Sequence, residues 1–313
     1  MRTFEFTVLG SNSALPTTER NPSAHVLNVH ERFYLIDCGE GTQMQIRKYG
    51  IKLQRIDQIF ISHLHGDHVF GLPGLLGTLH LLGRTKELAV YSPPGLEEII
   101  RLQHDASDTH LNYALNFVTI DTKKHSRIFE TDSLEVYSIP MQHRIPCCGF
   151  LFRERIHTFN IRKEKIEELG LGVEEIRLIR SGADHRLKSG EVVPNAELTQ
   201  HRKEARSFAF CSDTRPSPIY EDAIRDVDLL YHEATFLDEL KDKAKKTWHT
   251  TAKEAGMIAR KANAGRLIIG HFSSRYGNPP LSLLEEARGI FPETVLAEEG
   301  KCYSVLAKDL LRN

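Results

Sequence analysis

The chain has 313 residues, of which 40% are hydrophobic and 27% are charged, and these values are ordinary for a folded globular protein. They exclude a chain too polar to build a core, and the length allows one large domain or two small ones. The formal net charge is −1 and the pI is close to 7.0, so bulk charge gives no support for nucleic-acid binding, and any such site must be a local patch.

The first half of the chain alternates short apolar runs with amphipathic segments, which is typical of an α/β protein. The runs that we expect to be strands are 4–10, 26–29, 33–36, 59–61, 88–91, 117–120, 128–130, 134–139 and 149–152. Helices are expected at 42–49, at 72–82 and from about residue 96. Strands and helices that alternate in this way predict sheets covered by helices.

Residues 153–206 differ in character from the rest of the chain. They are charged, are interrupted by glycines and hold no long apolar run, so we interpret them as an excursion from the body of the fold. Beyond them the pattern returns, with strands expected at 207–211, 228–231, 266–270 and 302–306 and helices at 218–226, 251–262 and 281–290.

One stretch carries an unusual density of potential metal ligands. The apolar run 59–61 is followed within a few residues by His63, His65, Asp67 and His68. Residues two apart in an extended segment point to the same side, and Gly66 allows the chain to turn the later pair back toward them. Neutral imidazole and carboxylate groups together are the ligands expected for zinc or a similar divalent ion. A polar loop with incidental histidines explains this density less well.

Further titratable groups follow other apolar runs, each near the end of an expected strand. They are His143 after 136–139, Asp213 after 208–211, His232 and Glu233 after 229–231, and His271 after 267–270. Ligand sites of α/β sheets form beyond the carboxyl ends of the strands. Each group alone is better interpreted as a polar strand end, but together they predict one cleft.

The candidate ligands are too many for a single tetrahedral ion. They are His63, His65, Asp67, His68, His143, Asp213 and His271. Two ions bridged by Asp213 accommodate all of them, with the first two histidines and His143 on one ion and Asp67, His68 and His271 on the other. Each ion keeps an open position, so the residues predict metal-assisted hydrolysis of an anionic ester but not its substrate.

The cysteines and residues 1–10 indicate in which cellular compartment the protein is expected. Five cysteines, with no C-x-x-C spacing, suit reduced thiols rather than a disulfide framework. Residues 1–10 lack the pattern of a signal peptide, and no apolar stretch is long enough to span a membrane. We therefore expect a cytoplasmic protein with no membrane partner.

The His-x-His-x-Asp-His pattern at 63–68 resembles the signature of the metallo-β-lactamase superfamily, and the chain as a whole resembles the ribonuclease Z family of tRNA 3′-processing endonucleases. The segments that carry this resemblance are 34–43, 62–68, 71–74, 212–215, 232–236, 249–251 and 272–276. The His-Glu-Ala-Thr run at 232–235 and the His-Thr-Thr run at 249–251 are more specific than the superfamily signature.

The resemblance implies an αββα sandwich that spans residues 1–313 as a single domain, with a substrate-binding arm inserted at about 153–206. It implies two Zn²⁺ ions, for which Mn²⁺ or another divalent ion can substitute, and a homodimer that acts on precursor tRNA. The implied reaction removes the 3′ trailer after the discriminator nucleotide, leaving a 3′-hydroxyl on the tRNA and a 5′-phosphate on the trailer.

The resemblance also assigns roles to individual residues. Asp67 is a proton acceptor as well as a ligand, and His249, oriented by Glu233, protonates the leaving oxygen. The substrate-binding residues that the matching segments suggest are Arg20, Asn21 and Arg275. Without the resemblance, His249 would be interpreted as a surface histidine.

The sequence departs from the family in its arm and leaves rival functions open. Residues 153–206 hold twelve Lys or Arg against ten Asp or Glu, so the arm is barely basic, and Thr18 occupies a position where a lysine is common in the family. One rival is a hydrolase of small phosphoesters, such as cyclic nucleotides, which needs neither the arm nor His249. The other is a non-enzymatic zinc protein, but structural zinc sites are rich in cysteine, and no cysteine is a convincing ligand here.

Overall fold

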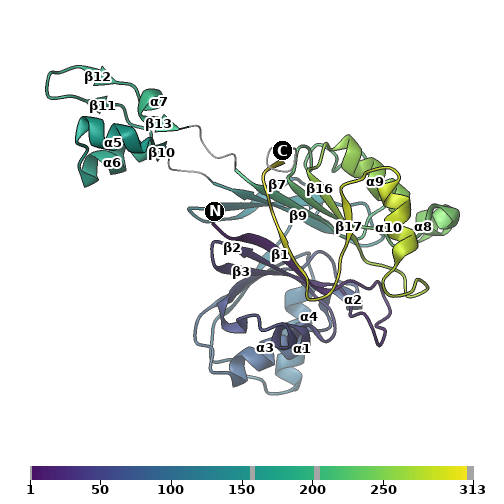
Figure 1. Cartoon of the computed structure of the whole chain (residues 1–313). Coiled ribbons are helices and arrows are strands. Elements are labelled where there is room, and N and C mark those ends of the chain that lie inside the picture. Colours follow the sequence, from purple (N-terminus) through teal and green to yellow (C-terminus); the bar gives the residue numbers. More distant parts are fainter. Residues whose placement is uncertain (1, 156–158, 201–204, 309–313) are drawn as a thin grey trace.

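The computed structural model describes residues 2–155, 159–200 and 205–308. Two seven-stranded sheets face each other in the body of the protein (Figure 1). The first sheet has the order β18 (Cys302–Ser304), β1 (Phe4–Gly10), β2 (Ala24–Val29), β3 (Arg32–Cys38), β4 (Ile56–Phe60), β5 (Leu88–Ser92) and β6 (Leu115–Thr119). Strands β3 to β6 run parallel to one another, whereas β18, β1, β2 and β3 pair antiparallel.

The second sheet repeats this mixture of directions. Its order is β17 (Thr294–Leu296), β16 (Arg266–Gly270), β15 (Leu229–Glu233), β14 (Ser207–Cys211), β9 (Cys148–Glu154), β8 (Leu134–Pro140) and β7 (Ser126–Glu130). Strands β14 to β17 are parallel, and β14, β9, β8 and β7 pair antiparallel. Each sheet therefore has a parallel half whose carboxyl ends open toward loops.

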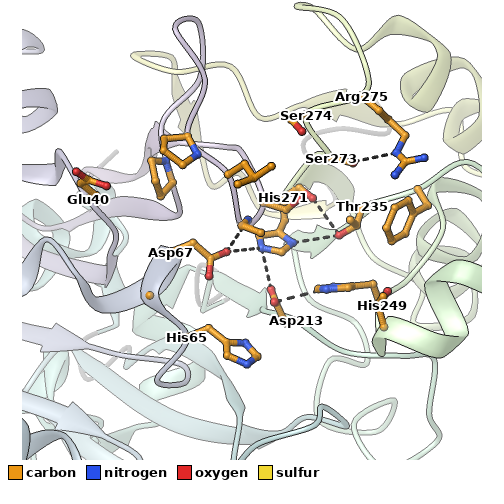
Figure 2. Close-up of a pocket in the computed structure, with 18 of the residues that line it drawn as sticks. Glu40, His65, Asp67, Asp213, Thr235, His249, His271, Ser273, Ser274 and Arg275 are labelled. Atoms are coloured by element: carbon orange, nitrogen blue, oxygen red, sulfur yellow. Dashed lines mark hydrogen bonds and ion pairs between the residues drawn. The ribbon is translucent and has the colours of Figure 1, made fainter.

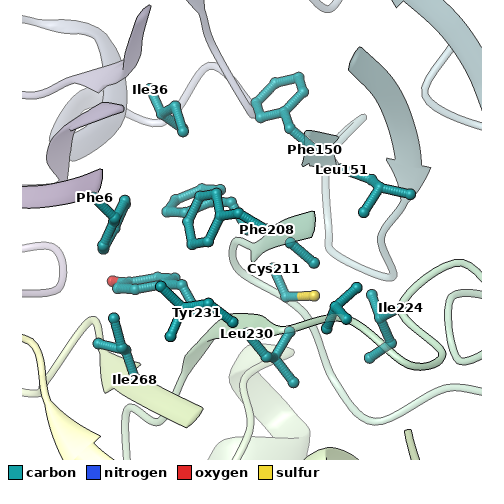
Figure 3. Close-up of a cluster of buried hydrophobic side chains, with 14 of the residues drawn as sticks. Phe6, Ile36, Phe150, Leu151, Phe208, Cys211, Ile224, Leu230, Tyr231 and Ile268 are labelled. Atoms are coloured by element: carbon teal, nitrogen blue, oxygen red, sulfur yellow. The ribbon is translucent and has the colours of Figure 1, made fainter. Parts of the chain in front are cut away.

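Strand residues alternate between two hydrophobic clusters, which explains the layering. Ile36 and Phe60 belong to the cluster between the sheets, whereas Leu35 and Ile59 belong to the cluster under the helices. Successive side chains of a strand point to opposite faces, so strands that are apolar throughout cover both clusters. Figure 3 shows the inter-sheet cluster, in which Phe6 from the first sheet lies near Tyr231 from the second, with ring centroids 5.6 Å apart.

Helices cover the outer face of each sheet. On the first sheet these are α1 (Thr42–Lys48), α3 (Leu72–Leu81) and α4 (Leu96–Ala106), and on the second α9 (Ala252–Lys261) and α10 (Leu281–Arg288) (Figure 1). The short helices α2 (Gly66–Val69) and α8 (Lys241–Thr247) lie in connecting segments. The expected αββα sandwich is confirmed.

The segment 159–200 forms a small unit that extends away from both sheets (Figure 1). Its elements are β10 (Asn160–Ile161), α5 (Lys163–Leu169), α6 (Val173–Arg180), β11 (His185–Arg186), β12 (Val192–Val193), α7 (Asn195–Leu198) and β13 (Thr199–Gln200). Leu171, Ile179 and Leu198 form a hydrophobic cluster of their own there. The fold therefore carries an inserted arm with a separate core, and the flanking residues 156–158 and 201–204 lie outside the described ranges.

Several predicted elements differ from the observed ones. Residues 218–226 form a run of turns rather than the expected helix, and their backbone bonds include links of three residues, from Glu221 N–H to the Pro218 carbonyl and from Arg225 N–H to the Asp222 carbonyl, each at 3.3 Å. Strand β15 runs to Glu233, so His232 and Glu233 lie inside the strand and not beyond it. Neither α8 nor β17 was expected.

Two further observations concern the cysteines and the hydropathy of the helices. All five cysteines are free thiols, and four of them are buried. Among the described helices, none combines the length and the hydropathy needed to cross a bilayer.

Candidate active site

The loops beyond the parallel strands of both sheets line one cleft of about 670 Å³. The seven predicted ligands meet at its floor, although they come from four separate parts of the chain. His63, His65, Asp67 and His68 follow β4, His143 follows β8, Asp213 follows β14 and His271 follows β16. Figure 2 shows Asp67, Asp213 and His271 pointing toward one another. The prediction that distant strand ends deliver these side chains to one place agrees with this geometry.

The first group of ligand atoms comprises three histidine nitrogens and one carboxylate oxygen. The His65 Nδ1 lies 3.0 Å from the His63 Nε2 and 3.2 Å from the His143 Nε2. The Asp213 Oδ2 lies 3.6 Å from the His63 Nε2 and 3.9 Å from the His143 Nε2. All four atoms lie within 4.8 Å of one another, close enough to surround a single ion.

The second group uses the other oxygen of the same aspartate. The Asp213 Oδ1 lies 3.2 Å from the His271 Nε2 and 3.5 Å from the His68 Nε2. The Asp67 Oδ2 is 3.3 Å from each of these two nitrogens. Asp213 therefore stands between the two groups with one oxygen toward each, as a bridging ligand requires.

The atoms of this site fit a pair of divalent ions. The Asp213 Oδ1 is fully buried and has no hydrogen-bond partner among the described residues. A buried carboxylate oxygen without a partner is costly unless a cation satisfies it. The imidazole nitrogens and carboxylate oxygens around it are zinc-type donors, so a divalent ion would satisfy this oxygen.

A second ring of hydrogen bonds fixes the orientation of the histidines. The Nδ1 atoms of His68, His143 and His271 lie 2.7 Å from the Asp37 Oδ2, 3.2 Å from the Trp248 carbonyl oxygen and 3.1 Å from the Thr235 Oγ1. Each of these nitrogens donates outward, which leaves Nε2 as the free ligand atom directed to the cleft. The imidazoles are therefore held in the tautomer that metal binding needs.

Asp37 is the important residue that the sequence analysis did not select. It is fully buried at a left-handed φ of 56°, and its Oδ1 accepts from the Ser62 backbone N–H at 2.8 Å. Its Oδ2 accepts from the Ser62 hydroxyl at 3.0 Å as well as from His68. A signal was present, since Asp37 directly follows the apolar run 33–36, but Asp37 lies inside β3 and is distant in sequence from the histidine cluster.

The electrostatic environment suits metal binding. Burial lowers the pKa values of His63, His65 and His143, which keeps these imidazoles neutral and able to coordinate an ion. Burial acts to raise the pKa values of Asp67 and Asp213, but the surrounding histidines outweigh it and hold both carboxyl groups far below their usual range. Both aspartates are therefore ionised ligands at any physiological pH.

His249 and Glu233 form a pair beside the ligand groups. The His249 Nδ1 lies 2.9 Å from the Glu233 Oε1. It also lies 3.9 Å from the Asp213 Oδ2 (Figure 2). Burial acts to lower the pKa of His249, but the Glu233 and Asp213 carboxylates outweigh it and raise that pKa to about 9. An imidazolium at this position is a proton donor. His249 also lies within ligand distance of Asp213 and His271.

Glu233 is itself firmly held, and so is the backbone next to His249. Glu233 is fully buried, its Oε1 accepts from the Thr214 N–H at 3.0 Å, and its Oε2 accepts from the Thr235 hydroxyl at 2.7 Å. Trp248 has a left-handed φ of 64°, and its ring stacks under the Arg215 guanidinium at 3.9 Å. The same Trp248 residue supplies the carbonyl that orients His143, so ligand and proton donor share one support.

The three expected substrate-binding residues lie at different depths. Arg20 is only 4% exposed and donates to the carbonyls of Gly277 and Tyr276 at 2.7 and 2.9 Å, so its guanidinium braces two loops and does not face the cleft. Asn21 donates to the Glu299 Oε2 at 2.8 Å. Arg275 is exposed and lines the cleft.

Comparison with known proteins agrees with this geometry. A family model described as "Anti-Pycsar protein Apyc1" matches residues 4–168. The ribonuclease Z of Bacteroides fragilis (strain YCH46) is 45% identical over 305 residues, which cover 97% of this chain and 100% of that protein.

Solved structures agree in fold. The short form of human tRNase Z is 28% identical with a TM-score of 0.69, over 96% of this chain and 99% of that one. The metallo-β-lactamase fold protein YhfI from Bacillus subtilis, 16% identical, has a TM-score of 0.68 over 96% of this chain and 99% of that one, which shows a shared fold. The chain therefore belongs to the ribonuclease Z family of metallo-β-lactamase-fold nucleases and, through residues 4–168, to the group that the Apyc1 model describes.

Proposed function

We propose that the protein is a zinc-dependent endoribonuclease that removes the 3′ trailer from precursor tRNA. The observation that carries the proposal is the pair of ligand groups sharing Asp213, with the His249–Glu233 pair directly beside it. Membership of the ribonuclease Z family supports tRNA as the substrate. Mn²⁺ or another divalent ion is expected to substitute for zinc, because the ligand set is a mixture of nitrogen and oxygen.

The chemistry needs charge stabilisation, a nucleophile and a proton donor. When bound, two divalent ions supply Lewis-acid stabilisation of the phosphate charge and lower the pKa of water enough to provide a nucleophile near neutral pH. Asp67, at the rim of the ligand groups, accepts the proton of the attacking water. His249 donates its proton to the departing 3′-oxygen while Glu233 holds the imidazole in place.

In the proposed direction of cleavage, the 3′-oxygen is the leaving group that His249 protonates. Water adds to phosphorus, the P–O3′ bond breaks, and the 3′-oxygen takes the proton of His249. The products are a tRNA with a 3′-hydroxyl and a trailer with a 5′-phosphate. We propose that the cut falls after the discriminator nucleotide, with the acceptor stem entering the cleft as a duplex.

The remaining parts of the molecule take supporting roles in this proposal. The arm at about 153–206 grips the tRNA away from the cleft, and its described part, 159–200, extends from the body (Figure 1). Arg275 at the cleft contacts the RNA backbone, and Arg20 and Asn21 support the loops beside it. We further propose that the protein acts in the cytoplasm as a homodimer and as a single domain spanning 1–313.

A second candidate is a hydrolase of small phosphoesters such as cyclic nucleotides. The Apyc1 family model covers the His63 to His68 ligands and ends before Asp213, Glu233 and His249. The ribonuclease Z of B. fragilis matches across these later residues as well, over 97% of the chain. Of these two matches, the ribonuclease Z match is the one that covers Glu233 and His249, the pair proposed to supply the proton, which favours the first proposal.

Three substrates distinguish the candidates. The protein is incubated with a 3′-extended tRNA transcript, with an unstructured RNA of the same length and with a cyclic nucleotide. A single cut in the tRNA, with little cleavage of the other two, is the expected result. Equal cleavage of both RNAs contradicts the tRNA assignment, and hydrolysis of the cyclic nucleotide alone supports the second candidate.

A further inference from the structure

Phe70 is a large apolar side chain in the cleft to which the mechanism above gives no role. It lies directly after helix α2, three positions after Asp67, and 71% of its surface is exposed. Its ring lines the same cleft as Asp67, together with Leu15, which is 64% exposed. A single exposed apolar residue needs no explanation on an open surface, but an aromatic ring beside two ligand groups is placed where a substrate must pass.

Gly66 holds the ring of Phe70 in position. A Cβ atom built on Gly66 would lie 2.2 Å from the Phe70 Cε2 and 2.6 Å from its Cδ2 and Cζ. The ring therefore occupies the space that any other side chain at position 66 would need, and it rests against bare backbone. The Phe70 N–H donates to the Gly66 carbonyl at 2.9 Å, which fixes the two residues relative to each other. The edge of the Phe70 ring that faces Gly66 is therefore in contact with backbone, and the rest of the ring is exposed to the cleft.

The cleft also carries cationic side chains. Arg275 and Lys243 are exposed, line the cleft and approach the ring of Phe236 at 5.3 and 5.7 Å. Figure 2 shows Arg275 on the far side of His271 from Asp67, and Glu40 on the side of Asp67. The cleft that holds the ligand groups thus combines cationic side chains with exposed apolar ones, Phe70 among them.

This distribution matches the chemistry of a single-stranded nucleic acid, whose phosphates seek cations and whose bases stack on aromatic rings. We propose that Phe70 is a stacking platform for an unpaired nucleobase next to the scissile phosphate. The inference rests on the proposed function and adds a binding subsite to it. Stacking is tolerant of base identity, so the subsite orders the 3′ strand without reading its sequence.

The first test compares Phe70→Ala with the wild-type protein on two substrates. On a 3′-extended tRNA, loss of the platform should lower kcat/KM by roughly 5- to 100-fold, the range for one base stacked on an aromatic ring. Two further substrates are the same tRNA made abasic at the nucleotide before the cut and the same tRNA made abasic at the nucleotide after it. On one of these two, Phe70→Ala should lower kcat/KM by less than about threefold, because the base that stacks on Phe70 is already absent. Phe70→Tyr keeps the ring and should retain wild-type kcat/KM. An equal loss on intact and abasic substrates overturns the proposal.

The second test moves the ring without removing it. Gly66→Ala places a methyl group where the Phe70 ring lies and should reproduce the pattern of Phe70→Ala. Gly77→Ala is the matched control, since no atom lies within 4 Å of a Cβ at that position in helix α3. Metal content is measured for both variants. Wild-type kinetics in a Gly66→Ala protein that retains its metal contradict the role of the ring.

A fluorescence measurement separates this inference from the proposed function. A tRNA with 2-aminopurine beside the cleavage site and a non-hydrolysable linkage should be quenched on binding to the wild-type protein and less quenched with Phe70→Ala. Quenching without any cleavage of the natural substrate contradicts the proposed function and supports the platform. Cleavage of the natural substrate with equal quenching by both proteins contradicts the platform alone.

Discussion

The ligand site and the arm are built in opposite ways. The site lies at the junction of two sheets, where His63 and Asp213 are almost fully buried and most ligand histidines carry a second hydrogen bond. The arm 159–200 has only three buried residues in its own cluster, while Val173 and Leu178 are 81% and 58% exposed. The metal ligands are thus positioned by the strands of two sheets, whereas the proposed binding of tRNA is assigned to a small unit with its own core.

The connection between the two regions reinforces this division. Glu154, at the end of β9, and Arg206, just before β14, bond through their backbones at 2.9 Å and through their side chains at 2.6 Å. These contacts close the sheet at the base of the arm. Substitutions that disrupt one region should therefore leave the other intact.

Asp213→Ala should have the largest effect, because it removes the carboxylate between both ligand groups. The protein should lose both ions and its activity should fall to background, whereas His271→Ala should mainly weaken one ion. Elemental analysis after dialysis measures the metal content, with the exposed helical substitution Asp105→Ala as the control. Two tightly held ions in Asp213→Ala would show that the bridge is assigned wrongly.

His249→Ala should slow turnover by roughly 10² to 10⁴, the usual range for a general acid, while both ions and the affinity for tRNA remain. The readouts are single-turnover kinetics and metal content, and exposed His110→Ala is the control. Loss of an ion in His249→Ala would instead identify this residue as a ligand.

Asp37→Asn should weaken the second ion through His68. Asn tolerates the left-handed backbone at this position, but it accepts more weakly from the His68 Nδ1, so metal affinity should fall by roughly 10- to 100-fold. Competition with a chelator measures the affinity. An unchanged affinity would mean that the bond from Asp37 does not tune the site.

Replacing 162–198 with Asn-Gly should remove the arm and leave the site. Ile161 and Thr199 are antiparallel partners, so a two-residue turn can join them. Metal content should not change, while tRNA binding should weaken and the slope of its salt dependence should flatten because fewer phosphates are neutralised. An unchanged slope would show that the arm does not touch the tRNA backbone.

Ile179→Ala should have the smallest effect on the body of the protein. Such a truncation of a buried side chain lowers the free energy of unfolding by about 2–5 kcal/mol, and Ile179 contacts only the cluster of the arm. Hydrogen exchange should therefore become faster only within 159–200. The matched substitution Leu75→Ala in α3 should lower the melting temperature of the body. A similar drop in the melting temperature of the body in both variants would show that arm and body unfold together.

The sequence predicted the parts of the molecule in which local pattern and tertiary structure agree. Strands 207–211 and 266–270 match their predicted bounds, because buried parallel strands are short apolar runs between polar groups. The convergence of His143, Asp213 and His271 followed from the rule that sites form beyond strand ends. The roles of His249 and Glu233 depended on resemblance, since no local pattern distinguishes His249 from a surface histidine.

What could not be predicted depends on contacts between distant residues. Asp37 matters because it meets His68, 31 positions away, and the inward turn of Arg20 depends on carbonyls more than 250 positions away. The helix predicted at 218–226 was wrong. Tyr220 and Ile224 are buried at a helical spacing, but consecutive turns can bury two residues at this spacing as well. The elements of the arm are too short to show periodicity.

Mapping both product ends of a cleaved 3′-extended tRNA tests the central claim most directly. The account predicts one cut after the discriminator nucleotide, with a 3′-hydroxyl on the tRNA and a 5′-phosphate on the trailer, abolished by chelation and restored by zinc or manganese. A 3′-phosphate on the tRNA, or cleavage that survives complete removal of metal, would contradict it.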